Sequence, residues 1–168
     1  DASMLRDRLS MLLFRRMGIP APRQSHARVY VGPGRDFAGV YAVVEDVNKS
    51  FLDANFGEND GYLYEYQRQE AYRFEDPGPD LGWYRSRFDP KTHENDSTAN
   101  LYRPIRNLVE AVNDALSSAL EDKLDDRLSL NTFITEIAVQ NFLAQNDGLL
   151  GDLGMNNFYL YRFERKGL

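Results

Sequence analysis

The stretch Gln145-Asn146-Asp147-Gly148 places an acidic side chain at the end of an apolar helix pattern. Asn156 and Asn157 follow nine and ten residues after Asp147, where a short aromatic strand pattern begins. A carboxylate can accept the proton of a hydroxyl nucleophile, and carboxamide oxygens suit a hard cation such as magnesium. Asp152 offers another oxygen ligand. The spacing therefore points to phosphoryl transfer, with Asp147 as base and Asp152, Asn156 and Asn157 as candidate metal ligands.

Two other interpretations of this loop stay open. Asn-Asp-Gly at a helix end is also a common turn sequence, and taken alone that interpretation is favoured. Asp147, Asp152 and Asn156 could instead hold calcium in a structural domain, although the spacing is not that of an EF-hand and no glutamate closes the loop.

A second candidate region follows the apolar strand pattern that ends at Val44. Glu45 stands where this strand would pass into a short helix, and backbone groups in such a linker can pair with the edge of an adenine. Lys49 could reach a phosphate. The spacing alone favours a strand end with a helix cap and a surface lysine. Gly32-Pro33-Gly34 lacks the remaining glycine and lysine of a phosphate-binding loop and predicts a hairpin turn.

Composition excludes several chemistries. The chain has 168 residues, no cysteine and only two histidines, His26 and His93, which are far apart in the sequence. Cysteine nucleophiles and disulfides are therefore absent, and a histidine zinc site is disfavoured. The net charge of -6 argues against a nucleic-acid partner. No apolar run reaches the length of about 18 residues that a membrane span needs, and no signal peptide pattern opens the chain.

The elements that must position these residues follow from hydrophobic spacing. Helices are expected over 5–17, near 51–56, from 102 or 103 to about 120, and from 129 or 131 to 146, with Gly148 as a left-handed stop. Strands are expected over 26–31, 37–44, 62–66 and 158–161. Residues 67–98 are polar and rich in turns, which predicts a surface insertion with a possible short strand at 83–88. Residues 121–127 form a charged link. Early strands and late helices favour an α+β, two-lobed arrangement.

Five ordered segments of the chain resemble the CotH-like family of atypical protein kinases, which is named for a spore coat protein. The resemblance covers most of the sequence apart from residues 67–90. It is carried by Leu5 to Arg23, by Ala27-Arg28-Val29-Tyr30-Val31 to Leu52, by Phe56-Gly57-Glu58-Asn59-Asp60-Gly61-Tyr62-Leu63-Tyr64, by Lys91-Thr92-His93-Glu94-Asn95, and by Asn146-Asp147-Gly148 with Asn156-Asn157-Phe158-Tyr159-Leu160-Tyr161.

The resemblance implies a kinase-like fold and ATP-dependent phosphorylation of protein serine or threonine hydroxyls, with magnesium or manganese as the metal. Asp147 matches the family's catalytic aspartate, and Asn156 or Asn157 its metal-binding asparagine. Glu45 to Val47 match the region near the nucleotide, next to Lys49. Ordinary protein kinases place the asparagine five residues after the catalytic aspartate, where this chain has Asp152.

The resemblance also implies that the chain is a partial kinase domain. The family's phosphate-contacting lysine strand and its Trp-Asp-x-Asp metal-binding element are expected outside residues 1–168, so the segment alone is expected to be inactive. Relatives suggest a coat or surface protein as substrate and a bacterial surface, secreted or spore-coat setting. The alternative is a non-catalytic kinase-like module for binding or for coat and surface adhesion.

Overall fold

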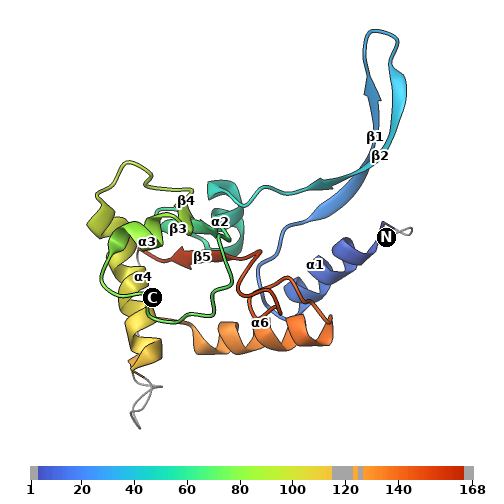
Figure 1. Cartoon of the computed structure of the whole chain (residues 1–168). Helices are drawn as coiled ribbons and strands as arrows, with labels where there is room; N and C mark the ends of the chain where they lie inside the picture. The colour runs from blue at the N-terminus through green and yellow to red at the C-terminus, as the bar shows by residue number, and fades with distance from the viewer. Residues whose placement is uncertain (1–3, 115–122, 125–126, 165–168) are drawn as a thin grey trace. The chain divides into compact units, whose positions relative to one another are not determined.

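The chain forms two compact units, Asp1–Gly57 and Glu58–Leu168. A computed structural model describes residues 4–114, 123–124 and 127–164 (Figure 1). Helices and small antiparallel sheets are mixed in this structure, which confirms the predicted α+β class. Among the described residues, no helix has the length and apolar character that crossing a membrane requires.

The first unit contains a helix, a hairpin and a second, short helix. Its elements are α1 (Arg6–Arg16), β1 (Gln24–Val31), β2 (Asp36–Val44) and α2 (Lys49–Phe56). β1 and β2 pair antiparallel as the long hairpin of Figure 1, with a register shift between Val29 and Tyr30. The predicted turn closes the hairpin, since the Arg35 N–H donates to the Gly32 carbonyl at 3.1 Å.

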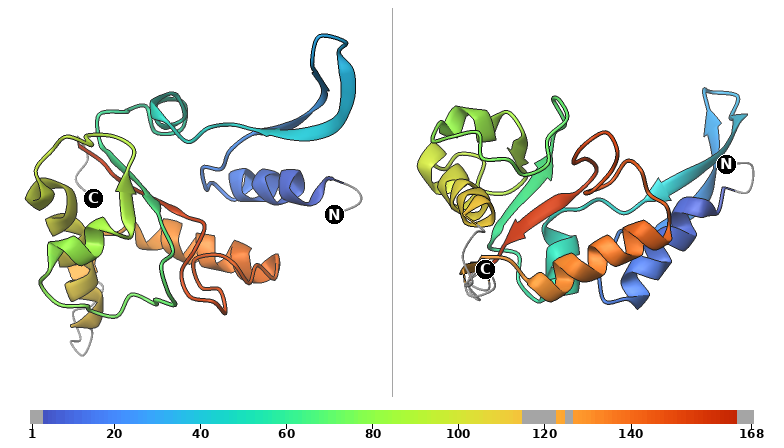
Figure 2. Two further views of the ribbon diagram at one scale, coloured as in Figure 1. Left: turned by 45° about the horizontal axis from the view of Figure 1, so that its top comes forward. Right: turned by 60° about the horizontal axis from the view of Figure 1, so that its bottom comes forward.

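The second unit is built on a three-stranded antiparallel sheet with the order β4-β3-β5. β3 (Tyr62–Tyr66) lies in the centre, between β4 (Phe88–Pro90) and β5 (Tyr159–Arg162). Figure 2 shows β3 and β5 side by side. The helices of this unit are α3 (Leu81–Arg85), α4 (Thr98–Asn113) and α6 (Leu130–Phe142).

The core of the second unit lies between the sheet and α4. Leu101, Ile105, Leu108 and Val109 recur at helical spacing and are buried along one face of α4. The central strand contributes Tyr64, whose hydroxyl donates to the Leu101 carbonyl at 2.7 Å. This bond satisfies the polar end of a side chain that is 1% exposed.

Residues 67–98, which were predicted to lie on the surface, contribute to this core. Tyr72, Tyr84 and Phe88 are buried at 5%, 0% and 0% exposure and belong to the main hydrophobic cluster. The predicted surface location is therefore wrong for these side chains. The short strand predicted at 83–88 is also wrong. Asp80 caps α3 by accepting the Gly82 N–H, and β4 begins only at Phe88.

α4 begins four residues before the earliest predicted start. The Ser97 hydroxyl caps it by accepting the Asn100 N–H at 3.2 Å, so Pro104 lies inside the helix rather than in its first turn. The predicted end near Leu120 and most of the charged link at 121–127 lie outside the described residues. α6 begins after Ser129 as predicted. The apolar spacing of this helix predicted Ile134, Ala138 and Phe142 in the core, but all three are exposed, Ile134 at 61% and Phe142 at 80%.

Candidate functional site

The loop that joins α6 to β5 brings three of the predicted site residues together. The Asn156 amide nitrogen donates to Asp147 Oδ1 at 2.8 Å. The Asn157 amide nitrogen donates to Asp147 Oδ2 at 3.0 Å and to the Asp147 carbonyl at 2.8 Å. Asp147 is exposed, so its carboxylate is oriented by two carboxamides and still faces solvent.

This arrangement fits both a base and a metal site. Each carboxylate oxygen has a second lone pair, so Asp147 can accept a hydroxyl proton while both amide donors stay in place. Both carboxamides donate through nitrogen, and within the described structure their Oδ1 atoms accept no hydrogen bond. These neutral oxygens are of the kind that magnesium takes in phosphotransfer sites.

The structure does not join Asp152 to this group. Its carboxylate is exposed, and the contacts of this residue go through the backbone. The Asp152 N–H donates to the Asn146 carbonyl at 3.1 Å, and the Asp152 carbonyl accepts from Arg73 Nη2 at 2.9 Å. Over the described residues, no three His, Cys, Asp or Glu side chains cluster as a metal site. The groups that meet at Asp147 are its carboxylate and the amide nitrogens of Asn156 and Asn157.

Gly148 shapes the loop by its size rather than by a left-handed backbone. The prediction of a left-handed stop at Gly148 is wrong, because Ala144, with φ of 50°, takes the positive-φ position after α6. A Cβ atom on Gly148 would lie 2.5 Å from Gln140 Oε1. The absence of a side chain therefore lets the loop backbone close against α6.

Gln140 is a residue that the sequence analysis missed. It is 5% exposed, and its Oε1 accepts the Leu149 N–H at 2.9 Å. Its amide nitrogen donates to Glu136 Oε1 at 2.8 Å. Burial raises the pKa of Glu136, while the bond from Gln140 acts the other way. A buried amide and a half-buried carboxyl thus tie the candidate loop to the preceding helix.

The segment after β3 supports the loop from another direction. The Met155 N–H donates to the Tyr72 carbonyl at 2.8 Å, and Met155 is 2% exposed. Arg68 Nε donates to the Leu153 carbonyl at 3.2 Å. A Cβ on Gly154 would lie 2.7 Å from the Tyr72 nitrogen. The loop is therefore built into the core of the second unit, through residues that the sequence placed in an insertion.

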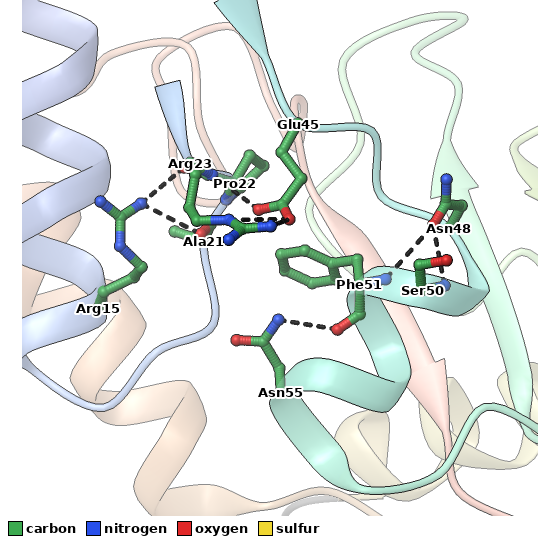
Figure 3. Close-up of polar contacts among 9 residues, drawn as sticks. All are labelled: Arg15, Ala21, Pro22, Arg23, Glu45, Asn48, Ser50, Phe51 and Asn55. Atoms are coloured by element: carbon green, nitrogen blue, oxygen red, sulfur yellow. Dashed lines mark hydrogen bonds and ion pairs between the residues drawn. The ribbon is translucent and has the colours of Figure 1, made fainter. Parts of the chain in front are cut away.

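The second group of predicted residues, Glu45, Val47 and Lys49, belongs to the first unit. The Glu45 carboxylate accepts from the Arg23 backbone N–H at 2.9 Å and from Arg23 Nε at 3.0 Å (Figure 3). The Glu45 N–H donates to the Arg23 carbonyl at 2.8 Å. The hydrogen bonds from Arg23 lower the pKa of Glu45. The carboxylate is thus occupied in closing the base of the hairpin.

The residues after Glu45 leave backbone groups available. Over the described residues, the backbone N–H and C=O groups of Asp46 and Val47 make no hydrogen bond. Asn48 then caps α2 by accepting the Ser50 N–H at 2.9 Å (Figure 3). Lys49 is the first residue of α2, and its side chain is exposed. The linker therefore offers an unpaired peptide edge next to a lysine.

The fold and the loop together define an α+β protein in which a carboxylate is held by two carboxamides between a helix and a strand. The model of the family described as CotH kinase protein matches residues 1–168, and the chain therefore belongs to the CotH kinase family. No curated protein matches the sequence. The family resemblance seen in the sequence is confirmed over the whole chain.

Proposed function

We propose that the chain contributes the catalytic loop and the nucleotide linker of an ATP-dependent kinase that phosphorylates serine or threonine hydroxyls of a protein. The observation that carries the proposal is the orientation of both Asp147 carboxylate oxygens by Asn156 and Asn157. Membership of the CotH kinase family supports the same reaction class.

In this proposal Asp147 accepts the proton of the substrate hydroxyl. The hydroxyl oxygen forms a bond to the γ-phosphorus while the bond from that phosphorus to the β,γ-bridging oxygen breaks, and ADP leaves. Asn156 and Asn157 keep the carboxylate aimed through their amide nitrogens. Their oxygens, with Asp152 as the third candidate from the sequence, would hold magnesium or manganese, which neutralises phosphate charge when bound.

The first unit would supply the nucleotide contacts. The free peptide groups of Asp46 and Val47 suit the donor and acceptor edge of an adenine. Glu45 would act indirectly, because Arg23 engages its carboxylate. Lys49 would reach a phosphate as a point charge.

The wider setting of the proposal follows from the family. We propose that the chain contributes to a two-lobed, kinase-like fold. The substrate would be a coat or surface protein, and the location a bacterial surface, a secreted setting or a spore coat. Membership of the CotH kinase family supports the kinase-like part of this proposal.

The test is phosphate transfer by the full-length protein that contains these residues, comparing wild type with Asp147→Asn. The substitution keeps the shape of the side chain and removes its basicity. General base catalysis contributes about 10²–10⁴-fold, so kcat is expected to fall by that factor while ATP affinity stays within about twofold.

Asp53→Asn is the matched control, because Asp53 is exposed and the same charge is removed. It is expected to leave kcat unchanged. Equal kcat values for wild type and Asp147→Asn would show that Asp147 takes no part in phosphate transfer. A full-length wild type without saturable ATP binding under magnesium or manganese would instead establish the non-catalytic binding module.

A further inference from the structure

A cavity of about 480 Å³ lies on the second unit, away from the Asp147 loop. It is lined by the start of α4, by the end of β5 and by a residue just before α6. The Asp147 loop enters β5 at Tyr159, whereas the cavity is lined by Arg162 at the strand's other end. At about 3.3 Å per residue, β5 separates the two places by about 10 Å.

Three arginines from separate segments line this cavity, and Arg103 is exposed. Arg103 comes from α4, Arg162 from β5, and Arg127 from the residues before α6. Within the described part of the chain, none of the three forms an ion pair with a carboxylate. Elsewhere in the second unit, the buried Arg87 is paired with Glu70 and the half-buried Arg106 with Glu110. Three unpaired arginines in one cavity stand out in a chain of net charge -6.

Arg162 is held in place before any ligand arrives. Its guanidinium carbon lies 3.7 Å from the centroid of the Tyr62 ring, a cation–π contact. Its Nε is buried and has no hydrogen-bond partner among the described residues. Arg127 is also held, since its Nη1 donates to the Lys123 carbonyl at 2.5 Å. These contacts leave further N–H donors of both guanidinium groups for a ligand.

Charge at the cavity favours an anion. Glu164 is the acidic residue in the described lining, and its N–H donates to Glu58 Oε1 at 3.2 Å. The described lining therefore contains three arginines and one acidic residue. Ala99 and Asn100, in the first turn of α4, also line the cavity, and the N-terminus of this 16-residue helix adds partial positive charge. The planar guanidinium fork matches the oxygens of a phosphate in particular.

The size of the cavity and the residues that line it restrict the chemical class of the ligand further. The cavity measures about 480 Å³ and is open to solvent, so a group attached to the phosphate can extend out of it. Tyr62 is the aromatic residue of the described lining. Its ring stacks on His93 with centroids 4.2 Å apart, in addition to the contact with Arg162. His93 and Arg162 can both lie this close to the Tyr62 ring only on its opposite faces. No face of the ring is then left for a nucleobase to stack on.

We propose that Arg103, Arg127 and Arg162 form a binding site for a phosphate monoester, separate from the Asp147 loop. The ligand is a phosphorylated hydroxyl compound without a nucleobase, such as a phosphorylated serine side chain. The site is independent of the proposed phosphotransfer, because it uses none of the residues assigned to that reaction.

The test is calorimetric titration of the whole chain, without ATP, with a short phosphoserine peptide. Saturable binding is expected with the phosphopeptide and none with its unphosphorylated form. Inorganic phosphate is expected to compete, and AMP to bind no more tightly than inorganic phosphate. Arg103→Gln and Arg127→Gln are each expected to weaken binding by about 10-fold or more, since hydrogen bonds to charged groups contribute on that scale.

Arg85→Gln is the matched control, because Arg85 is an exposed arginine of the same unit outside the cavity lining. It is expected to leave the affinity unchanged, with all three variants melting like wild type. Absence of saturable phosphopeptide binding, equal losses in Arg85→Gln and Arg103→Gln, or failure of inorganic phosphate to compete would each overturn the proposal.

Discussion

Around Asp147, single residues have separable tasks. Asn156 and Asn157 orient the carboxylate directly, whereas Gln140 fixes the loop from below through the Leu149 N–H. Gln140 is in turn bonded to Glu136. Loss of the buried amide would leave a buried N–H group without a partner, which costs about 1–3 kcal/mol. Loop geometry therefore depends on a polar pair that lies on α6 and outside the loop itself.

The ionisation of Glu136 predicts a pH dependence of stability. Burial raises the pKa of Glu136 above its ordinary value of 4.5, so the folded protein holds this proton to higher pH than the unfolded chain does. Its contribution to stability is complete below 4.5 and is lost as the pH rises through the folded-state pKa. Glu136→Gln keeps an acceptor for Gln140 and cannot ionise. The variant is therefore expected to be more stable than wild type at pH 7.

The measurement is the difference in unfolding free energy between wild type and Glu136→Gln, from urea titrations between pH 4 and pH 8. This difference cancels the titration of all other groups. It is expected to vanish near the acid end and to grow with pH. A flat curve for Glu136→Gln would show that burial does not perturb this carboxyl.

For single residues, the sequence predicted the group around Asp147 from its unusual residue types. It did not predict residues whose role depends on packing. The spacing of Asp147, Asn156 and Asn157 predicted a group that the structure does bring together. Gln140 was overlooked because a glutamine in a helix is normally a surface residue. A signal was present, since Gln140 continues the stripe of Phe133 and Ile137 at helical spacing. Gln140, a polar residue in this apolar stripe, is buried and hydrogen-bonded.

At the scale of elements, the β1–β2 hairpin depends on the contacts between Arg23 and Glu45 at its base. Most of its side chains are exposed, including Tyr30 at 53% and Phe37 at 58%. An isolated two-stranded hairpin is marginally stable in water. Backbone pairing and the Arg23–Glu45 contacts at the base hold the strands together. The carboxylate of Glu45 therefore has a structural task regardless of any nucleotide.

Glu45→Gln is expected to loosen the base of this hairpin. The substitution removes the charge that binds the Arg23 guanidinium, so amide hydrogens near Arg23 and Glu45 are expected to exchange with solvent faster than in wild type. Hydrogen exchange followed by mass spectrometry over residues 20–48 measures this. Asp53→Asn, an exposed carboxylate of α2, is the control and should leave the exchange unchanged. Unchanged hydrogen exchange in Glu45→Gln would show that the Arg23–Glu45 contacts do not stabilise the base of the hairpin.

Element boundaries were predictable where turns or apolar spacing are distinct. Both strands of the hairpin and the start of α6 were predicted, whereas α3 and the start of α4 were not. Their caps were visible in the sequence as Asp80 and Ser97, but the polar composition of the segment outweighed them. Residues 67–98 reach the core through a few aromatics rather than a periodic pattern. Only the tertiary structure could show this burial.

At the scale of the whole molecule, the candidate phosphotransfer residues are divided between the two units. Glu45, Val47 and Lys49 lie in Asp1–Gly57, and Asp147, Asn156 and Asn157 in Glu58–Leu168. The proposed function thus assigns nucleotide contacts to one unit, and the base and metal ligands to the other. Substitutions in the two units should consequently have different signatures in nucleotide binding.

Lys49→Ala is expected to weaken ATP binding with and without magnesium, because a phosphate contact by a point charge needs no metal. A loss of about 10-fold corresponds to one charged hydrogen bond. Asn156→Ala is expected to affect only the part of the affinity that magnesium adds, because a neutral carboxamide oxygen acts through the metal.

Calorimetric titration of the full-length protein with ATP, at zero and saturating magnesium, separates these two signatures. Arg8→Ala is the control for Lys49, since Arg8 is an exposed cation of the same unit. If Lys49→Ala weakens ATP binding no more than Arg8→Ala does, Lys49 makes no phosphate contact and is only a surface lysine. An ATP affinity that Asn156→Ala leaves unchanged at saturating magnesium would mean that Asn156 binds no metal and serves only to orient Asp147. Since the two substitutions report on different units, either assignment can fail without the other.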